Sequence, residues 1–299
     1  MKIQFQDTGM PYPLTILKGY LRLSGVADSK IAFIVSELLK KSEKSNKWTE
    51  SDVLCFVESQ LQEESPDIVN SLQTIIAYEN LRAIQEDIPP IVVVIEGASA
   101  TGKSMVALDL IQALSPTRII STDTVRQILR DIHSKEEYPE LHCHTYQAFK
   151  YNQVGDTNLN PIIRGYNAQC TLISPHVIDM TKRVVSEGAK AIIEGVHISP
   201  GSMIEISEGV IEILVNPSYK IHQAMFASKS RIGKLKSVTS DKQIREEEFV
   251  STHIIQEYLE KQALRHQIPT INLDEYESVQ QETYRLILSK MNHLIELYK

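Results

Sequence analysis

The chain has 299 residues, of which 42% are hydrophobic and 23% charged, and its formal net charge is -7 at pH 7. This length suffices for one large domain or two modest ones, each with its own core. The acidic balance argues against a surface built mainly to bind nucleic acid, because such binding needs a cationic face. The cysteines Cys55, Cys143 and Cys170 form no CxxC pair, so they indicate neither a disulfide framework nor a cysteine zinc site.

Membrane insertion is not indicated at any point of the sequence. No stretch approaches the ~20 apolar residues that a membrane helix needs, and the first residues contain no apolar run of signal-peptide length. We therefore expect a cytoplasmic protein without a membrane partner. The sequence leaves open whether the chain forms a homo-oligomer.

Residues 13–88 carry apolar side chains at three- and four-residue spacing, which is typical of amphipathic helices. Thr49 is placed to cap one helix, and Ser65, directly before Pro66, is placed to cap another. The last helix should run to about Glu86, before two prolines stop it. The pattern predicts a small, mainly α-helical domain over residues 1–88.

Short apolar runs alternate with amphipathic helices after this point, as in α/β proteins. We expect helices between the strands, including one that is capped by Ser174 and ends near Gly188, and a long one from about Glu275. The pattern predicts an α/β domain over residues 89–299, with a five-stranded, mostly parallel sheet covered on both faces. The candidate strands are Ile91–Ile95, Arg118–Ser121, Ala189–Ile193, Val210–Val215 and Ile268–Asn272.

A glycine-rich loop follows the first candidate strand and leads into a helix. It has the G-x-x-x-x-G-K-[ST] pattern of phosphate-binding loops, whose glycines let successive amides point at phosphates. Lys103 would neutralise charge on the β- and γ-phosphates, and Ser104 would ligate Mg²⁺. The loop predicts an ATP- and Mg²⁺-dependent phosphotransferase. The residues expected to bind the cofactor are Gly97, Ala98, Ser99, Ala100, Thr101, Gly102, Lys103, Ser104 and Met105.

Two charged residues follow the second candidate strand, at a D-x-x-R spacing. Ligands of open parallel sheets bind beyond the carboxyl ends of the strands, so Asp123 and Arg126 should face the γ-phosphate. Asp123 would accept a proton from the acceptor hydroxyl, and Arg126 would hold an anionic group of the acceptor. The alternative is that Asp123 merely caps the next helix and Arg126 is solvated. The spacing favours catalysis, because it resembles the acceptor-side motif of polynucleotide kinases and zeta-toxin-like kinases.

The third candidate strand runs into a single carboxylate, Glu194. At that place it would hold Mg²⁺ or orient the attacking hydroxyl, and otherwise it would cap the next turn. His197, three residues later, is a further candidate for substrate binding.

Cations gather between Tyr219 and Arg245 although the whole chain is acidic. Such a run is typical of a lid that closes over phosphates, and its alternative is a solvated helix face. We expect Arg231 to take part in catalysis. The members are Lys220, His222, Lys229, Arg231, Lys234, Lys236, Lys242 and Arg245.

The segment from Leu141 to Tyr146 contains His142, Cys143 and His144, and imidazole and thiolate both bind zinc. Adjacent side chains rarely converge on one ion, however. Surface or substrate-facing histidines are therefore favoured over a zinc site.

These segments together resemble the 2-phosphoglycerate kinases of archaea and their relatives, and the resemblance covers most of the chain. It implies transfer from ATP to 2-phosphoglycerate, which gives 2,3-bisphosphoglycerate, with substrate contacts from Asp123, Arg126, His142, Tyr146 and His197. One departure concerns substrate choice, since the family usually continues after His142 with small hydroxyl residues. The resemblance rests on Ile95–Ser104, Arg118–Arg126 with Ile128–Arg130, Leu141-His142 with Tyr146, and Ile193–Gly201.

Residues 13–26 resemble the ATP-cone-type helical segment that precedes the kinase domain in that family. A true ATP-cone would imply a second nucleotide site, and the alternative is a helical packing domain.

Two other functions stay open beside a small-molecule kinase. The D-x-x-R spacing also suits a kinase of a nucleic-acid end or of another phosphorylated metabolite, although the acidic charge and the lack of aromatic stacking platforms argue against nucleic acid. A nucleotide-dependent regulator with little transfer activity is the third hypothesis.

Overall fold

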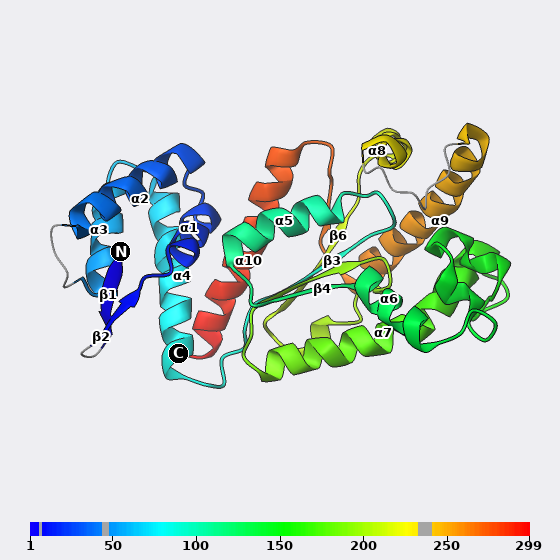
Figure 1. The fold of residues 1–299 in the computed structure, drawn as a ribbon, viewed down its shortest axis with the longest axis horizontal. Coiled ribbons are helices and arrows are strands. Elements are labelled where there is room, and N and C mark those ends of the chain that lie inside the picture. Colours follow the sequence, from blue (N-terminus) through cyan, green and yellow to red (C-terminus); the bar gives the residue numbers. More distant parts are fainter. Residues whose placement is uncertain (6–7, 44–47, 233–240) are drawn as a thin grey trace. The chain divides into compact units, whose positions relative to one another are not determined.

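The computed structural model describes residues 1–5, 8–43, 48–232 and 241–299, without the side chains of residues 5, 230–232 and 242. This part divides into two compact units (Figure 1). The first unit comprises Met1–Ile88, Asp109–Ser115 and Tyr284–Lys299. The second comprises Pro89–Leu108 and Pro116–Thr283, so the division falls within two helices, Lys103–Leu114 (α5) and Tyr276–Leu297 (α10).

The first unit is mainly helical, as the apolar spacing predicts. A two-stranded antiparallel hairpin precedes the helices, and the sequence pattern did not reveal it because its strands have only four residues each and the second is exposed along its whole length. Leu17, Leu21, Ile34 and Leu38 form the centre of the core with residues of the other helices. The elements are Lys2–Phe5 (β1), Thr8–Pro11 (β2), Leu14–Leu23 (α1), Asp28–Ser42 (α2), Glu50–Gln60 (α3) and Pro66–Ile84 (α4).

The two predicted helix caps of this unit differ in outcome. The Thr49 hydroxyl accepts a hydrogen bond from the Asp52 amide at 3.2 Å, and the Asp52 carboxylate accepts one from the Thr49 amide at 2.8 Å. This reciprocal arrangement confirms Thr49 as a cap. Ser65 occupies the capping position of α4 but makes no side-chain cap bond, so Pro66 alone marks that start.

The second unit contains a five-stranded sheet in the order β4-β5-β3-β6-β7, and every strand pair in it is parallel. This confirms the predicted α/β architecture. The last strand is shorter than expected, and the third begins two residues later. The strands are Val92–Glu96 (β3), Arg118–Ser121 (β4), Ala191–Gly195 (β5), Val210–Val215 (β6) and Thr270–Ile271 (β7).

Helices connect these strands, and the apolar side chains of the helices pack against those of the sheet. Val92, Val94 and Ile193 of the sheet pack in one cluster with Val125 and Val177 of two of these helices. The helices are Thr122–Ile132 (α6), Pro161–Ser186 (α7), Tyr219–Ile232 (α8) and Lys242–His266 (α9), with short 3-10 helices at Pro139–His142, Thr145–Lys150 and Ile204–Ile206.

The predicted start of α7 at Ser174 is wrong. The helix begins at Pro161, capped by the Asn160 side chain, which accepts from the Ile162 amide at 2.9 Å. Pro175 lies inside the helix, and the Ser174 hydroxyl donates to the His197 carbonyl at 2.8 Å. The extra turns persist because they contribute buried residues to the core, so tertiary packing outweighs the cost of the proline.

The carboxyl ends of β3, β4 and β5 meet at one edge of the sheet, because neighbouring parallel strands point the same way. The glycine-rich loop and Asp123 follow the ends of β3 and β4, and Glu194 is the residue before the last one of β5. In the described parts of the chain, no helix is both long and apolar enough to cross a membrane.

Candidate active site

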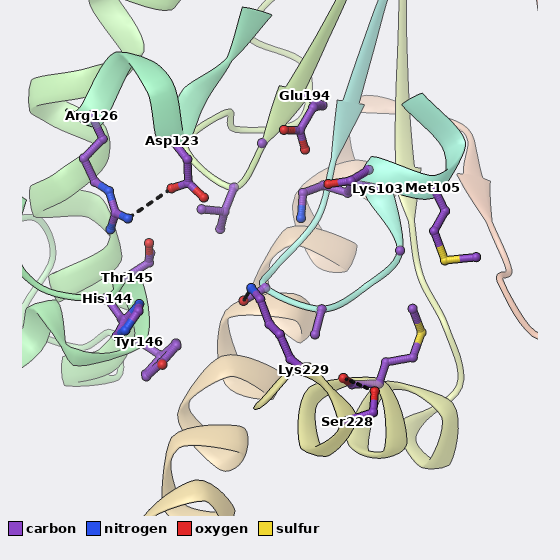
Figure 2. Close-up of a pocket in the computed structure, with 17 residues that line it drawn as sticks. Lys103, Met105, Asp123, Arg126, His144, Thr145, Tyr146, Glu194, Ser228 and Lys229 are labelled. Carbon is purple, nitrogen blue, oxygen red and sulfur yellow. Dashed lines mark hydrogen bonds and ion pairs between the residues drawn. The ribbon is translucent and has the colours of Figure 1, made fainter. Parts of the chain in front are cut away.

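A cavity of ≈ 490 Å³ lies at this edge of the sheet. Its wall includes the glycine-rich loop, the first turn of α6, the end of β5, the start of the 3-10 helix at Thr145 and one face of α8. Figure 2 shows the Lys103 and Glu194 side chains on one side of it and Asp123, Arg126 and Thr145 on another. The cavity thus brings together the groups expected for a nucleotide and for an acceptor.

The glycine-rich loop has a backbone that only small residues allow. Gly97 and Gly102 have φ values of 146° and 95°. A Cβ atom at Gly97 would come within 2.6 Å of the Thr101 hydroxyl oxygen, and one at Gly102 would overlap the Leu273 side chain. Both glycines are therefore required for this loop conformation.

The amides at the start of α5 are free to bind a ligand. Among the described residues, none accepts a hydrogen bond from the backbone N–H groups of Gly102, Lys103 and Ser104. A helix N-terminus with unpaired amides is a ready site for phosphate. The loop therefore fits a polyphosphate.

Lys103 reaches back into the loop. Its ammonium donates to the Ala98 carbonyl at 2.7 Å, and burial lowers the pKa of Lys103 to about 8, against the opposing effects of Glu194 and Asp123. The Lys103 ammonium therefore interacts with these two carboxylates, and a bound phosphate would stabilise its charge further.

The predicted cofactor-binding residues fall into two groups. Gly97, Ala98 and Thr101 are buried and do not line the cavity, and the Ala98 amide is already bonded to the Gln256 side chain at 2.7 Å. Gln256 also donates to Val215 and Asn216, so it ties the loop to β6 and α9. The other predicted residues line the cavity: Ser99, Ala100, Gly102, Lys103, Ser104 and Met105.

Asp123 and Arg126 form an ion pair at the cavity, with 3.2 Å between Oδ1 and Nη2. The Arg126 side chain is only 14% exposed, and its Nη1 donates to the Cys143 carbonyl at 2.8 Å. Asp123 lies in the first turn of α6, whose N-cap residue is Ser121. These positions exclude the alternative of a capping aspartate and a solvated arginine.

The charge state of Asp123 follows from its neighbours. Desolvation would raise the pKa of Asp123, but Arg126 and more distant cations, Lys103 and Lys229 among them, together hold that pKa below its usual value. The carboxylate is therefore ionised at neutral pH and able to accept a proton.

Glu194 stands opposite Ile95 and Ser121 in the sheet register, between the strand of the glycine-rich loop and the strand of Asp123. It is half-buried and lines the same cavity as Ser104. The described residues contain no group of three or more His, Cys, Asp or Glu side chains that would hold a metal ion by themselves. A hydroxyl and one carboxylate suit Mg²⁺, which usually completes its shell with phosphate oxygens and water.

Helix α8 contributes a cation that the sequence did not single out. The Lys229 ammonium donates to the Ser99 hydroxyl at 3.0 Å, and burial lowers the pKa of Lys229. His222, two turns earlier on the same helix, bonds the Ser99 carbonyl at 2.9 Å. The spacing of seven residues within a helical pattern was the available signal, since it places both side chains on one face.

The other lid cations have different positions. The Arg231 side chain, Lys234 and Lys236 lie outside the described residues. Arg245 is buried, paired with Glu248 at 3.1 Å, and its guanidinium lies 3.8 Å from the centre of the Phe226 ring. Arg245 thus supports α8 and does not line the cavity.

Two predicted substrate contacts are also not on the cavity wall. The His142 Nε2 lies 3.0 Å from the His133 carbonyl oxygen. His197 is fully buried, and burial lowers the pKa of its imidazole to about 3. Tyr146 does line the cavity, where its ring packs edge-on against Phe226.

Curated relatives were found for the chain, although no family model matches it. The 2-phosphoglycerate kinase of Methanothermobacter thermautotrophicus is 25% identical over 91% of this chain and 90% of that protein. The 2-phosphoglycerate kinase of Thermococcus kodakarensis is 27% identical over 96% of this chain and 94% of that protein. The chain is thus similar to these 2-phosphoglycerate kinases over nearly its whole length.

A further 2-phosphoglycerate kinase, from Pyrococcus furiosus, is 30% identical, over 63% of this chain and only 61% of that protein. Among solved structures, protein TT1252 from Thermus thermophilus matches 67% of this chain and 97% of that one, with 18% identity and a TM-score of 0.40. A likeness at that score carries no functional argument.

Proposed function

We propose that this chain is an ATP-dependent kinase that transfers the γ-phosphate to a hydroxyl of a small anionic acceptor, with 2-phosphoglycerate as the acceptor. The observation that carries the proposal is the single cavity that contains both Lys103 of the glycine-rich loop and the Asp123–Arg126 pair. The names of the relatives supply the identity of the acid, and the product would be 2,3-bisphosphoglycerate.

The donor side of the cavity would position ATP. The free amides at the start of α5 would bind phosphate oxygens, and Lys103 would exchange its bond to the Ala98 carbonyl for the β- and γ-phosphates. Ser104 and Glu194 would hold Mg²⁺, which neutralises the charge that develops on the phosphates. Lys229, from the opposite wall, would add positive charge at the transferring group.

The acceptor side would activate and orient the acid. Asp123 is ionised, so it would accept the proton of the acceptor hydroxyl as the oxygen attacks phosphorus. Arg126 donates one Nη1 hydrogen to Cys143 and its Nη2 forms the ion pair with Asp123, which leaves hydrogens on both terminal nitrogens for an anionic group of the acid. Although the whole chain is acidic, Lys103, Arg126 and Lys229 thus lie where the negative charge of the substrates would be.

The test is a product assay with purified protein, ATP, Mg²⁺ and 2-phosphoglycerate, in which ADP and the bisphosphorylated acid are both followed. Asp123→Ala should lower kcat by roughly 10²- to 10⁴-fold, the usual contribution of a catalytic base. Lys103→Ala should abolish product, and Lys182→Ala, an exposed lysine of α7, is the matched control that should leave turnover unchanged.

Other outcomes would replace the proposal. ADP release that ignores the acid but rises with an oligonucleotide would identify a kinase of nucleic-acid ends. ATP binding without turnover against a set of phosphorylated acids would identify a nucleotide-dependent regulator.

A further inference from the structure

A buried histidine adjoins the acceptor side of the cavity. His197 has no exposed surface, and its ring nitrogens contact three side chains. Nδ1 lies 3.0 Å from the Thr122 hydroxyl oxygen, and Nε2 lies 2.9 Å from Gln169 Oε1 and 3.2 Å from the Thr145 hydroxyl oxygen. Of these residues, Thr145 lines the cavity.

The orientation of the Gln169 amide is fixed from its other end. Its Nε2 donates to the Glu140 carbonyl and lies 3.4 Å from the Cys143 carbonyl oxygen, so the nitrogen must point that way. The oxygen Oε1 therefore faces His197. Because an amide oxygen only accepts hydrogen bonds, His197 Nε2 must carry the hydrogen.

This assignment determines the directions of two hydroxyl groups. A neutral imidazole with hydrogen on Nε2 has a lone pair on Nδ1, which accepts the Thr122 hydroxyl hydrogen. The Thr145 oxygen shares the Nε2 hydrogen with Gln169, so its own hydrogen points away from His197. Within the described residues, the Thr145 hydroxyl has no other hydrogen-bond partner.

The neutral state of the ring has a structural cause. Burial lowers the pKa of His197, and the cations Arg126 and Lys103 act in the same direction, against the effect of Asp123. The ring is therefore uncharged over the whole neutral range, and its tautomer does not change there.

Thr145 and Arg126 act on the same side of the cavity. Arg126 holds the Cys143 carbonyl, two residues before Thr145, and Gln169 holds the Glu140 carbonyl of the same segment. This short segment thus has a fixed position, with the Thr145 hydroxyl and the Arg126 guanidinium both on the cavity wall. Figure 2 shows both side chains on the same side of the cavity, where a hydroxyl hydrogen and a guanidinium can bind one oxyanion.

We propose that Thr145 donates its hydroxyl hydrogen to the anionic group of the acceptor that Arg126 binds, and that His197, held by Gln169, is the positioning residue that keeps this hydrogen directed into the cavity. The inference rests on the proposed function and deepens it. It assigns His197 a role through Thr145 and gives the acceptor an additional, uncharged donor.

The first experiment compares Thr145→Val with Thr145→Ser. Valine keeps the shape and leaves the His197 bond to Gln169 intact, whereas serine keeps the hydroxyl. Thr145→Val should raise KM for 2-phosphoglycerate by roughly 10- to 100-fold, the effect of losing one hydrogen bond to a charged group, with KM for ATP unchanged. Thr145→Ser should stay within about threefold of the wild type. An unchanged KM for the acid in Thr145→Val, or an equal rise for ATP, would overturn the proposal.

The second experiment tests the positioning role. His197→Gln retains an N–H donor near the place of Nε2 and should restore most of the affinity that His197→Asn loses. The double variant His197→Asn with Thr145→Val should be no worse for 2-phosphoglycerate than Thr145→Val alone, because both changes remove one function. Additive losses would mean that His197 only supports the fold, contrary to the proposal.

A measurement on the unaltered protein needs no variant to fold. In ¹⁵N-labelled protein, His197 Nε2 should show the shift of a protonated nitrogen and Nδ1 that of an unprotonated one, without change between about pH 5 and pH 8. The opposite tautomer would refute the proposal. If the wild type forms no product from the acid, the proposed function fails. The inference is then decided by this spectrum and by the affinity for inorganic phosphate, which should be lower in Thr145→Val than in the wild type. Equal affinities would overturn it.

Discussion

Replacing Lys229 by methionine tests whether α8 supplies charge to the transferring phosphoryl group. Methionine preserves length and apolar packing but removes the ammonium and its 3.0 Å bond to the Ser99 hydroxyl. The side chain lines the cavity (Figure 2), so a bound phosphate would lie within a few ångströms of the charge. The change therefore isolates one charge near the reacting centre.

The expected magnitude follows from Coulomb's law. Two unit charges about 4 Å apart attract by about 4 kcal/mol at the effective dielectric constant of about 20 that suits partly buried sites. Each 1.36 kcal/mol corresponds to a tenfold change in rate, so the upper limit is about 10³-fold. Because part of this attraction already acts in the ground state, we expect kcat/KM to fall by roughly 10²- to 10³-fold, mostly in kcat.

The assay is steady-state ADP release at several concentrations of ATP and of 2-phosphoglycerate. Lys220→Met is the matched control, since Lys220 is exposed on the same helix and should change kcat/KM by less than about twofold. Thermal unfolding of both variants should stay near the wild type, because the lost bond is offset by removing a desolvated ammonium. A Lys229→Met enzyme within about threefold of the wild type would refute the assignment of this lysine to the phosphoryl group.

Three further predictions concern the loop and the strand before it. Since the pKa of Lys103 is about 8, the affinity for ATP should be constant below that pH and fall above it. The accompanying proton uptake can be measured by calorimetry in buffers of different ionisation enthalpy. An affinity that stays constant up to about pH 9 would contradict this. Gly102→Ala should abolish ATP binding while the sheet stays folded by circular dichroism, because its Cβ would overlap Leu273 at a φ of 95°; retained affinity would show that the loop adapts. Glu96 is fully buried, and burial and then Glu212 raise its pKa well above the usual value of 4.5. Its stabilising contribution is therefore complete below about pH 4.5 and is lost as pH rises through the folded value. The free energy of unfolding of Glu96→Gln, measured by urea denaturation, should therefore increase relative to that of the wild type between about pH 5 and pH 8. A difference between the two proteins that does not change with pH would mean that Glu96 ionises freely.

Much of the kinase-like unit was predictable because its signals are local. The strand before the glycine-rich loop is a short apolar run that is buried along its whole length, and the loop pattern depends on residue types that the backbone itself demands. The capping box at Thr49 is local in the same sense, since both partners lie within one helical turn. The hairpin before α1 was missed because its strands have only four residues each and the second is exposed along its whole length.

Predictions of the start of α7 and of residue roles on the acceptor side required more than local signals. Ser174 before a proline has the pattern of a helix start, but the preceding turns bury Tyr166 and Ile173, and that burial decides the matter. Likewise His197 follows the strand end like a ligand-binding residue, yet the chain folds Thr122, Thr145 and Gln169 around it.

The sequence by itself determined the parallel sheet, the glycine-rich loop and the places of Asp123 and Glu194 near the carboxyl ends of their strands, because the apolar period, the glycine positions and the strand direction are properties of short segments. Only the tertiary structure decided which cations reach the cavity. Helix α8 brings Lys229 to the loop, Arg245 is buried against the Phe226 ring, and Thr145 and Arg126 line the same cavity through contacts between residues far apart in the chain. Side-chain direction at such contacts depends on the packing of neighbouring elements, and no local pattern encodes it.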